Sequence, residues 1–270
     1  MKLKAYAKIN FSLRVFEKRP DGFHNIESVM QSISLCDYLI LQPDANGIDL
    51  TMDTPNLPAD KRNLAAKAAE LFFRKQKLKP GVKIHLQKNI PIAAGLAGGS
   101  ADAAAVLFGL NQLFKIPFSD EELSKIGAEV GSDVPFCLVG GTCLVTGRGE
   151  KVAKLVPWHK TYIILVNPDI HVSTKWAYET FDDLHVNTPE EVQNDLEPVV
   201  APQYPVIGEI KEKLLKLGCS EAQMSGSGPT VFGKVKQKEE AERIIKLIKE
   251  EYPRCYLAET MDRGVEVVEE

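Results

Sequence analysis

The most constraining feature of the chain is the segment PIAAGLAGGSADAAA, residues 91–105, which joins a strand-like stretch to a helix of small residues. The preceding VKIHLQ alternates apolar and polar residues, as a half-buried strand does. Three glycines, Gly95, Gly98 and Gly99, leave the backbone open. An anion can then approach backbone N–H groups and the positive end of the helix. The segment favours a phosphate site, and a plain tight turn between strand and helix is the alternative.

Two well-known phosphate-binding loops do not match this segment. The P-loop pattern GxxxxGK[ST] requires a lysine, and none precedes Ser100. The dinucleotide pattern GxGxxG follows its strand directly, whereas residues 89–92 intervene here and the glycine spacing differs. The Ser100 hydroxyl adds a possible ligand for a phosphate oxygen or a magnesium ion.

Composition narrows the class of protein. With 270 residues, the chain fits one large domain or two modest ones. A net charge of -4 and a pI of about 5.8 argue against a binder of duplex nucleic acid. No run reaches the ~20 apolar residues of a bilayer span, and the alternating N-terminus does not resemble a signal peptide. The five scattered cysteines indicate reduced thiols, so we expect a cytoplasmic protein without nucleic-acid or membrane partners.

Periodicity predicts an α+β protein in which helices and strands interleave. Ser119 and Glu122 have the spacing of a capping box at the start of one helix. The strands expected most clearly are 3–16, 26–43, 82–87, 161–168 and 229–235, and the helices are 63–75, 101–114, 119–130, 207–218 and 238–252. We place a soft domain boundary near residue 155, which gives an N-terminal domain over 1–155 and a C-terminal domain over 156–270.

Two further segments can serve the same site. In KIN, Lys8 and Asn10 lie on one face of an early strand because side chains alternate along a strand. The turn SGSGPT, residues 225–230, offers N–H and hydroxyl donors between two strands. Taken alone, a solvated lysine and an ordinary tight turn are the simpler interpretations.

In their order along the chain, AKIN, RPDGFH, PIAAGLAGGSADAAA, GSDVPF, GRGE and SGSGPT resemble the GHMP kinases. The resemblance implies a two-domain fold. Its N-terminal half would be similar to the ribosomal-protein-S5-domain-2-like fold and its C-terminal half ferredoxin-like, with the active site in the cleft between them. It also implies that ATP is the phosphoryl donor and that Mg²⁺ is delivered with it.

AKINFSL, RPDGFHNIES and GSDVPF together resemble the members of this family that act on a cytidine-bearing alcohol. They imply phosphorylation of the 2-hydroxyl of a cytidine-diphosphate-linked methylerythritol in non-mevalonate isoprenoid synthesis. One alternative is another kinase of the family, of the homoserine or mevalonate type. A more distant alternative is a non-catalytic RNA-binding module, since the S5-type fold also occurs in ribosomal proteins. A nucleotide sensor without turnover would have to lack the catalytic pair described next.

By its place in GSDVPF, Asp133 resembles the catalytic base of the family, and Lys8 resembles its partner. A positioned carboxylate can take the proton of an alcohol during phosphoryl transfer, and an ammonium beside it keeps it ionised. The alternative for Asp133 is a helix cap. Asn10, on the face of Lys8, would hydrogen-bond the substrate.

The resemblance assigns the cytidine to a second group of residues. His24 would contact the edge of the cytosine and Phe23 would stack on its ring, although the family more often has tyrosine before this histidine. Tyr178 is the stacking aromatic on the other side, with Trp176 as a competitor, and Thr174 is a hydroxyl contact. The residues of the glycine-serine turn assigned to the substrate are Ser225, Gly226, Ser227 and Gly228.

The resemblance assigns the glycine-rich segment to the triphosphate of ATP. The residues expected to wrap it are Pro91, Ile92, Ala93, Ala94, Gly95, Leu96, Ala97, Gly98, Gly99, Ser100 and Ala101. Asn63 and Lys88 are expected near the nucleoside, although each could be an ordinary cap or surface residue. At positions 94 and 97 the family often has glycine, and we expect alanine there to require negative φ.

Overall fold

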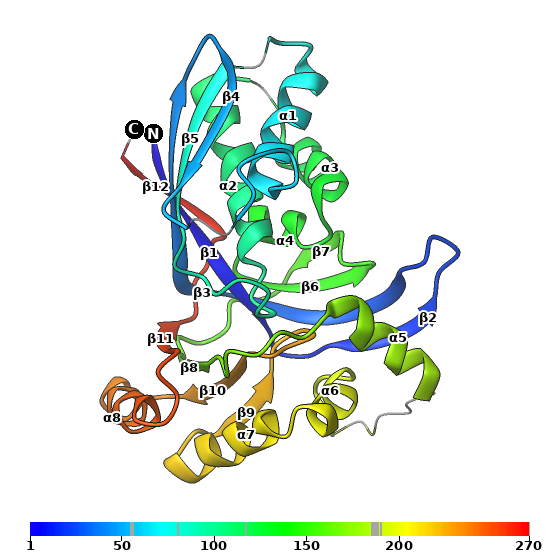
Figure 1. Cartoon of the computed structure of the whole chain (residues 1–270), viewed down its shortest axis with the longest axis vertical. Helices are drawn as coiled ribbons and strands as arrows, with labels where there is room; N and C mark the ends of the chain where they lie inside the picture. Colours follow the sequence, from blue (N-terminus) through cyan, green and yellow to red (C-terminus); the bar gives the residue numbers. More distant parts are fainter. Residues whose placement is uncertain (55–56, 80, 117, 185–188, 190, 270) are drawn as a thin grey trace.

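The computed structural model describes residues 1–54, 57–79, 81–116, 118–184, 189 and 191–269, and their strands form two sheets. The larger sheet has eight strands, five of them in the order β12-β1-β3-β5-β4. Their bounds are Lys2–Asn10 for β1, His24–Pro43 for β3, Gly47–Met52 for β4, Gly81–Gln87 for β5 and Val265–Glu269 for β12. The last strand of the chain thus lies beside the first, as the adjacent red and blue strands in Figure 1 show.

The long strand β3 organises the larger sheet because its two halves have different partners. Its second half pairs with β1 and β5, and its first half pairs with β2 (Arg14–Lys18) and β6 (Thr142–Gly147). A short strand β7 (Lys151–Lys154) extends this end of the sheet from β6. The β2–β3 hairpin projects from the body of the molecule in Figure 1 and carries the segment RPDGFH.

Four helices cover one face of the larger sheet (Figure 1). They are α1 (Leu64–Gln76), α2 (Gly98–Leu113), α3 (Asp120–Val130) and α4 (Val134–Val139). Helix α2 packs closely because it is built of small residues: a Cβ at Gly109 would lie 2.4 Å from the side chain of Leu41. The second half of α2 is therefore packed tightly against β1 and β3.

The smaller sheet is antiparallel, with the order β11-β8-β10-β9. Its strands are β8 (Tyr162–Val166), β9 (Glu221–Met224), β10 (Val231–Val235) and β11 (Cys255–Glu259). Strand β8 has a continuous apolar sequence, YIILV, because both of its faces are covered. Ile163 and Leu165 join the core of the larger sheet, whereas Ile164 and Val166 join a second core on the other side.

The second core lies beneath the helices of the C-terminal half, which form the lower part of Figure 1. They are α5 (Thr174–Leu184), α6 (Glu197–Gln203), α7 (Val206–Leu217) and α8 (Lys238–Lys249). Within the described part of the chain, none of the helices is both long and apolar enough to cross a membrane.

The structure confirms the expected α+β class and the main strands and helices, including the capping box of Ser119 and Glu122. Sequence periodicity did not reveal the short elements α4, α6, β4 and β7. The second half of the chain contributes to both sheets, because it returns to the larger one through β12. The division at residue 155 stays a prediction.

Candidate functional site

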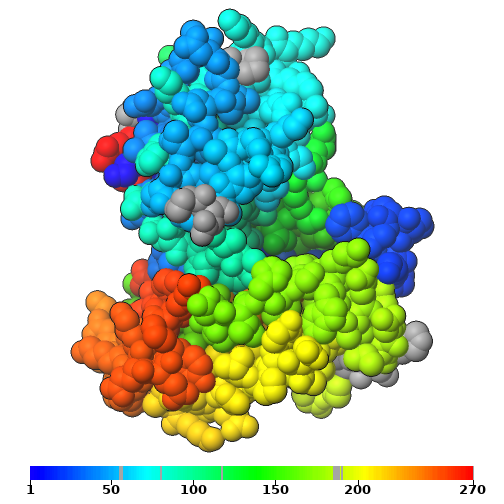
Figure 2. Space-filling view, in the orientation of Figure 1, coloured from blue at the N-terminus to red at the C-terminus, as the bar shows by residue number. Residues whose placement is uncertain are grey.

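A cleft of about 1020 Å³ lies where the two sheets and their helices meet. It is lined by the β2–β3 hairpin, the glycine-rich segment, the start of α5 and the turn before β10. In the space-filling view, residues of α5 lie directly next to the projecting hairpin (Figure 2). Most residues predicted for the site line this cleft, and the exceptions are Leu96, Ala101 and Ser225, which are buried behind it.

The glycine-rich segment turns sharply before it enters α2. Its first helical residues are Gly98, Gly99 and Ser100, and the first turn contains no acidic residue that would oppose an anion. The expectation that alanine here requires negative φ was wrong at one of the two positions, because Ala97 has a φ of 57°. Ala93 is also left-handed, with a φ of 52°. Such a conformation costs about 1–2 kcal/mol per residue, so the surrounding contacts must impose it.

Contacts from both halves of the chain impose this loop path. The N–H of Lys8 donates to the carbonyl of Leu96, and the Ser225 hydroxyl donates to the carbonyl of Gly95. Gly95 has a φ of 74°, and a Cβ there would lie 2.2 Å from the carbonyl oxygen of Ser225. Ser225 therefore supports the loop from behind, and the glycine turn of the second half closes directly on the loop of the first.

Lys8 lies at the centre of these contacts and is almost fully buried. Its Nζ donates to Asn10 Oδ1 at 2.8 Å and to the Gly95 carbonyl at 3.0 Å, and it lies 3.7 Å from Asp133 Oδ2. Asn10 in turn donates to the Ser28 hydroxyl. The alternation of side chains on β1 thus places Lys8 and Asn10 together, as the sequence predicted.

Asp133 occupies the N-cap position of α4, and yet its side chain makes no capping hydrogen bond. The carboxylate is 31% exposed and faces the cleft beside the Lys8 ammonium. A side chain used only as a cap would bond to the N–H groups of its own helix. The geometry therefore leaves this carboxylate available to a molecule in the cleft.

At the other end of the cleft, His24 from β3 meets α5. Its Nε2 lies 2.6 Å from Asp182 Oδ1, and its ring stacks on Tyr178 with centroids 5.2 Å apart. Lys18 from β2 donates to the second oxygen of Asp182 at 2.8 Å. Burial strongly raises the pKa of Tyr178, so its phenol is neutral. Of the competing aromatics, Trp176 packs on Tyr204 instead of lining the cleft.

Phe23 and Thr174 complete this end of the cleft. Phe23 is 48% exposed, and the Arg148 guanidinium lies 5.1 Å from its ring centroid. The hydroxyls of Thr174 and Ser227 are 2.8 Å apart, which joins α5 to the glycine-serine turn. Aromatic and hydroxyl groups thus gather at this end, whereas backbone N–H groups dominate the loop end.

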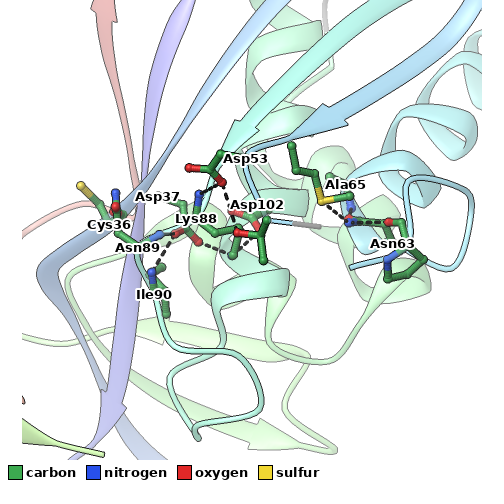
Figure 3. A network of polar contacts seen from close by, with 12 residues as sticks. Cys36, Asp37, Asp53, Asn63, Ala65, Lys88, Asn89, Ile90 and Asp102 are labelled. Atoms are coloured by element: carbon green, nitrogen blue, oxygen red, sulfur yellow. Dashed lines mark hydrogen bonds and ion pairs between the residues drawn. The ribbon is translucent and has the colours of Figure 1, made fainter. Parts of the chain in front are cut away.

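Lys88 lies beneath the glycine-rich segment in a buried ionic network (Figure 3). Its ammonium contacts Asp37 and, at 2.7 Å, Asp102 Oδ2. Asp37 also accepts the backbone N–H groups of Asn89 and Ile90 at 2.6 and 2.8 Å. Burial alone would lower the pKa of Lys88, but the two carboxylates outweigh it and raise that pKa. The Lys88 ammonium already has two carboxylate partners. A contact between Lys88 and ATP stays a prediction.

Asp102 is the least satisfied member of this network. It is 2% exposed, and its Oδ1 has no hydrogen-bond partner among the described residues. Burial raises the pKa of Asp102 well above its usual range, although Lys88 opposes the shift.

Asn63 also has a structural role. Its side-chain oxygen accepts the N–H of Ala65 and caps α1, and its amide donates to the Pro58 carbonyl (Figure 3). It lines the cleft next to Leu57 and Arg62, so its proximity to a nucleoside stays a prediction.

Sequence reasoning missed Asp37, Asp102, Asp182 and the place of Arg148. The first two had a readable signal, since Asp102 is the only charged residue of α2 and Asp37 interrupts an apolar run of β3, and such charges are paired when buried. Arg148 lay in the quoted GRGE segment without an assigned role. Asp182 is one of two adjacent aspartates on α5, and its spacing of four residues from Tyr178 is the signal that could have distinguished it from Asp183.

Comparison with protein families matches both parts of the chain. Residues 63–141 match the model described as "GHMP kinases N terminal domain", and residues 180–254 match "GHMP kinases C terminal". The first match contains the glycine-rich segment and Asp133.

Similar proteins cover nearly the whole chain. A 4-diphosphocytidyl-2-C-methyl-D-erythritol kinase of Clostridium acetobutylicum is 43% identical, over 97% of this chain and 100% of its own length. One from Caldicellulosiruptor saccharolyticus is 46% identical, over 86% and 87%. A crystal structure of 4-(cytidine 5'-diphospho)-2C-methyl-D-erythritol kinase superposes with a TM-score of 0.83 at 29% identity, over 96% and 99%. A homoserine kinase from Cytophaga hutchinsonii, 21% identical, shares the fold with a TM-score of 0.78, over 99% and 97%.

Proposed function

Because the chain belongs to the GHMP kinases, in the group of the 4-diphosphocytidyl-2-C-methyl-D-erythritol kinases, we propose that it phosphorylates 4-diphosphocytidyl-2-C-methyl-D-erythritol. The terminal phosphoryl group of ATP would pass to the 2-hydroxyl and leave ADP, in the non-mevalonate route to isoprenoids. The chain is an ATP-dependent enzyme of this family, and the expected two-domain kinase fold is confirmed.

The observation that carries the proposal is the single cleft in which Lys8 and Asp133 lie beside the glycine-rich segment. Asp133 would take the proton of the 2-hydroxyl as its oxygen attacks the terminal phosphorus and the bond to the β-phosphate oxygen breaks. Lys8 is fixed by Asn10 and Gly95, so its charge cannot move away from the carboxylate. It would keep Asp133 ionised and offset charge on the transferring group.

The start of α2 would hold the triphosphate. The N–H groups of its first turn have no intrahelical acceptors, and its dipole favours negative charge. Mg²⁺ bound to ATP needs only one or two protein ligands, and the Ser100 hydroxyl at the cleft wall is suited to be one. The ion would neutralise charge on the phosphate oxygens. Lys8 and the helix start supply the remaining positive potential from the protein itself.

The hairpin and α5 would hold the cytidine. Phe23 offers an exposed aromatic face, and base stacking on such a ring contributes about 1–3 kcal/mol. His24 offers a ring nitrogen, and Thr174 with Ser227 offers hydroxyls on the opposite wall. Tyr178 stacks on His24 and holds the histidine ring in place.

ADP release tests the function. The enzyme is incubated with Mg-ATP and, separately, the cytidine-diphosphate methylerythritol, homoserine, mevalonate and galactose. We expect turnover with the cytidine compound alone. Turnover with homoserine or mevalonate would move the protein to another branch of the family and remove the base from the recognition scheme. Retention on RNA that weakens with salt, without any turnover, would favour the RNA-binding alternative.

The cellular location that we propose is the cytoplasm. All five cysteines carry free thiols, and burial raises the pKa of Cys137, Cys143 and Cys219. Free thiols persist where the environment is reducing. ATP is also available there for the reaction.

A further inference from the structure

The contact between His24 and α5 is more specific than stacking. Tyr178 and Asp182 are four residues apart and therefore lie on one face of α5. That face presents an aromatic ring to the imidazole plane and a carboxylate to its Nε2 atom, at 2.6 Å. His24 is 6% exposed, so the ring has no freedom to turn toward bulk water.

Asp182 is held in the ionised form. Partial burial favours the neutral acid, but hydrogen bonds from Lys18 and His24 outweigh it and lower the pKa of Asp182. The charged groups around the pair are Lys18 on β2 and, on α5, Glu179 and Asp183, which both act on Lys18. An ionised carboxylate only accepts hydrogen bonds. The proton of the short contact therefore resides on His24 Nε2.

This arrangement decides the character of the other ring nitrogen. A neutral imidazole with its proton on Nε2 has an acceptor at Nδ1. Among the residues that the structure describes, no hydrogen bond reaches Nδ1, and His24 lines the cleft. Nδ1 is thus the nitrogen left for a ligand.

We propose that Asp182 is a positioning residue for base selection: it fixes His24 with an acceptor at Nδ1, which favours cytosine and disfavours uracil. The inference rests on the proposed function. Cytosine carries an amino group, a donor, at the position where uracil carries a carbonyl oxygen. An acceptor facing that position pairs with cytosine and repels uracil. A site built to pair with one group rejects the analogue that lacks it.

The first experiment determines which ring nitrogen of His24 carries the proton. Imidazole ¹⁵N shifts of His24 are recorded for the wild type and for Asp182→Asn, Asp182→Ala and the control Asp183→Asn, at about pH 8, where ordinary imidazoles are neutral. Asp183 is the exposed neighbour on the same helix, so the control removes the same charge without touching His24. We expect the Nε2–H tautomer in the wild type and the control, and a shift toward Nδ1–H in both Asp182 variants.

The second experiment measures base selection. CDP and UDP are tested as inhibitors competing with the cytidine substrate. We expect the wild type to prefer CDP, and the ratio of the two inhibition constants to fall about tenfold or more in Asp182→Ala, as the loss of a charged hydrogen bond predicts. The KM of the cytidine substrate should rise by about the same factor, with kcat nearly unchanged. Asp183→Asn should stay within about twofold of the wild type.

Failure of this inference is distinguishable from failure of the proposed function. If the wild type phosphorylates the cytidine substrate but Asp182→Ala keeps both the CDP preference and the Nε2–H tautomer, the inference is overturned and the function stands. If the wild type phosphorylates another alcohol instead, the function falls. Should Asp182→Ala not fold, Asp182→Asn keeps the side-chain volume and gives the same readouts.

Discussion

The two ends of the cleft are built in different ways. The loop of the phosphate end is contiguous in sequence: residues 91–101 form it, and Lys88, Asp37 and Asp102 next to it also belong to the first half of the chain, although Ser225 of the second half contacts the loop as well. The base end joins His24 of β3 to Tyr178 and Asp182 of α5, which lie in different halves. The first end uses backbone N–H groups, and the second uses side chains.

This difference fits what each end is proposed to bind. A triphosphate is the same in every ATP-dependent kinase, so backbone donors and a helix dipole suffice, whatever the side chains. A substrate base has to be distinguished from similar bases, which requires donors and acceptors at defined positions. We infer that variation at the base end changes the substrate, whereas variation at the phosphate end damages folding or ATP binding.

Asp133 lies where the two ends meet, and its loss should have the largest effect. Asp133→Ala removes the proposed base, so kcat should fall about 10²- to 10⁴-fold. The KM for ATP and for the cytidine substrate should change little, because neither end is altered. Steady-state kinetics checks both values, with Asp133→Asn as the variant that keeps the side-chain shape. Near-normal turnover of either variant would remove Asp133 from the mechanism.

Substitutions at the phosphate end should lower activity by destabilising the folded protein. Lys88→Met leaves Asp37 and Asp102 buried without their cation, and the free energy of unfolding should fall by about 3–5 kcal/mol. The control is Lys83→Met on β5, the strand that leads into Lys88; the Lys83 side chain is exposed, and its pair with Asp44 contributes about 1 kcal/mol or less. Urea denaturation of the two variants gives the comparison. Equal losses would show that the buried network does not support the loop.

Substitutions at the base end should lower only the affinity for the cytidine substrate. Phe23→Ala removes an exposed ring that lines the cleft, so the KM for the cytidine substrate should rise by a factor equivalent to about 1–3 kcal/mol. Phe16→Ala is the matched control, since Phe16 is equally exposed on the same hairpin but does not line the cleft. The KM for ATP should stay unchanged in both. A rise in the KM for ATP would contradict the separation of the two ends.

The smallest effect concerns Asp102 and depends on pH. Its pKa is raised in the folded protein, because burial disfavours the charge. The folded state therefore holds a proton that the unfolded chain releases. This stabilisation is complete below the ordinary carboxyl pKa and is lost as the pH rises toward the raised value.

Asp102→Asn mimics the protonated form, so the wild type should lose stability relative to this variant as the pH rises. At neutral pH we expect the two to differ by about 1 kcal/mol or less, the contribution of one hydrogen bond. Urea denaturation at about pH 5 and about pH 8 measures the trend. Parallel pH profiles would mean that Asp102 is ionised in the folded state.

Local sequence pattern was sufficient to predict the secondary structure around the glycine-rich segment. The glycine-rich segment, the strand before it and the helix after it were all readable, because backbone geometry follows from a few neighbouring residues. The alternation along β1 likewise placed Lys8 beside Asn10. One detail was wrong: Ala97 adopts a left-handed conformation, since contacts with Lys8, Gly95 and Ser225 hold the loop there.

The sequence by itself determined the fold class, the course of the chain from strand through glycine-rich segment to helix, and the types of residue that meet in the cleft. Only the tertiary structure decided that α5 lies against His24, where Asp182 contacts the imidazole, and that Asp37 and Asp102 share Lys88. These contacts join residues that are far apart in sequence, and their geometry depends on how β3, α2 and α5 pack. Local propensity carries no information about such distances, because packing sets them.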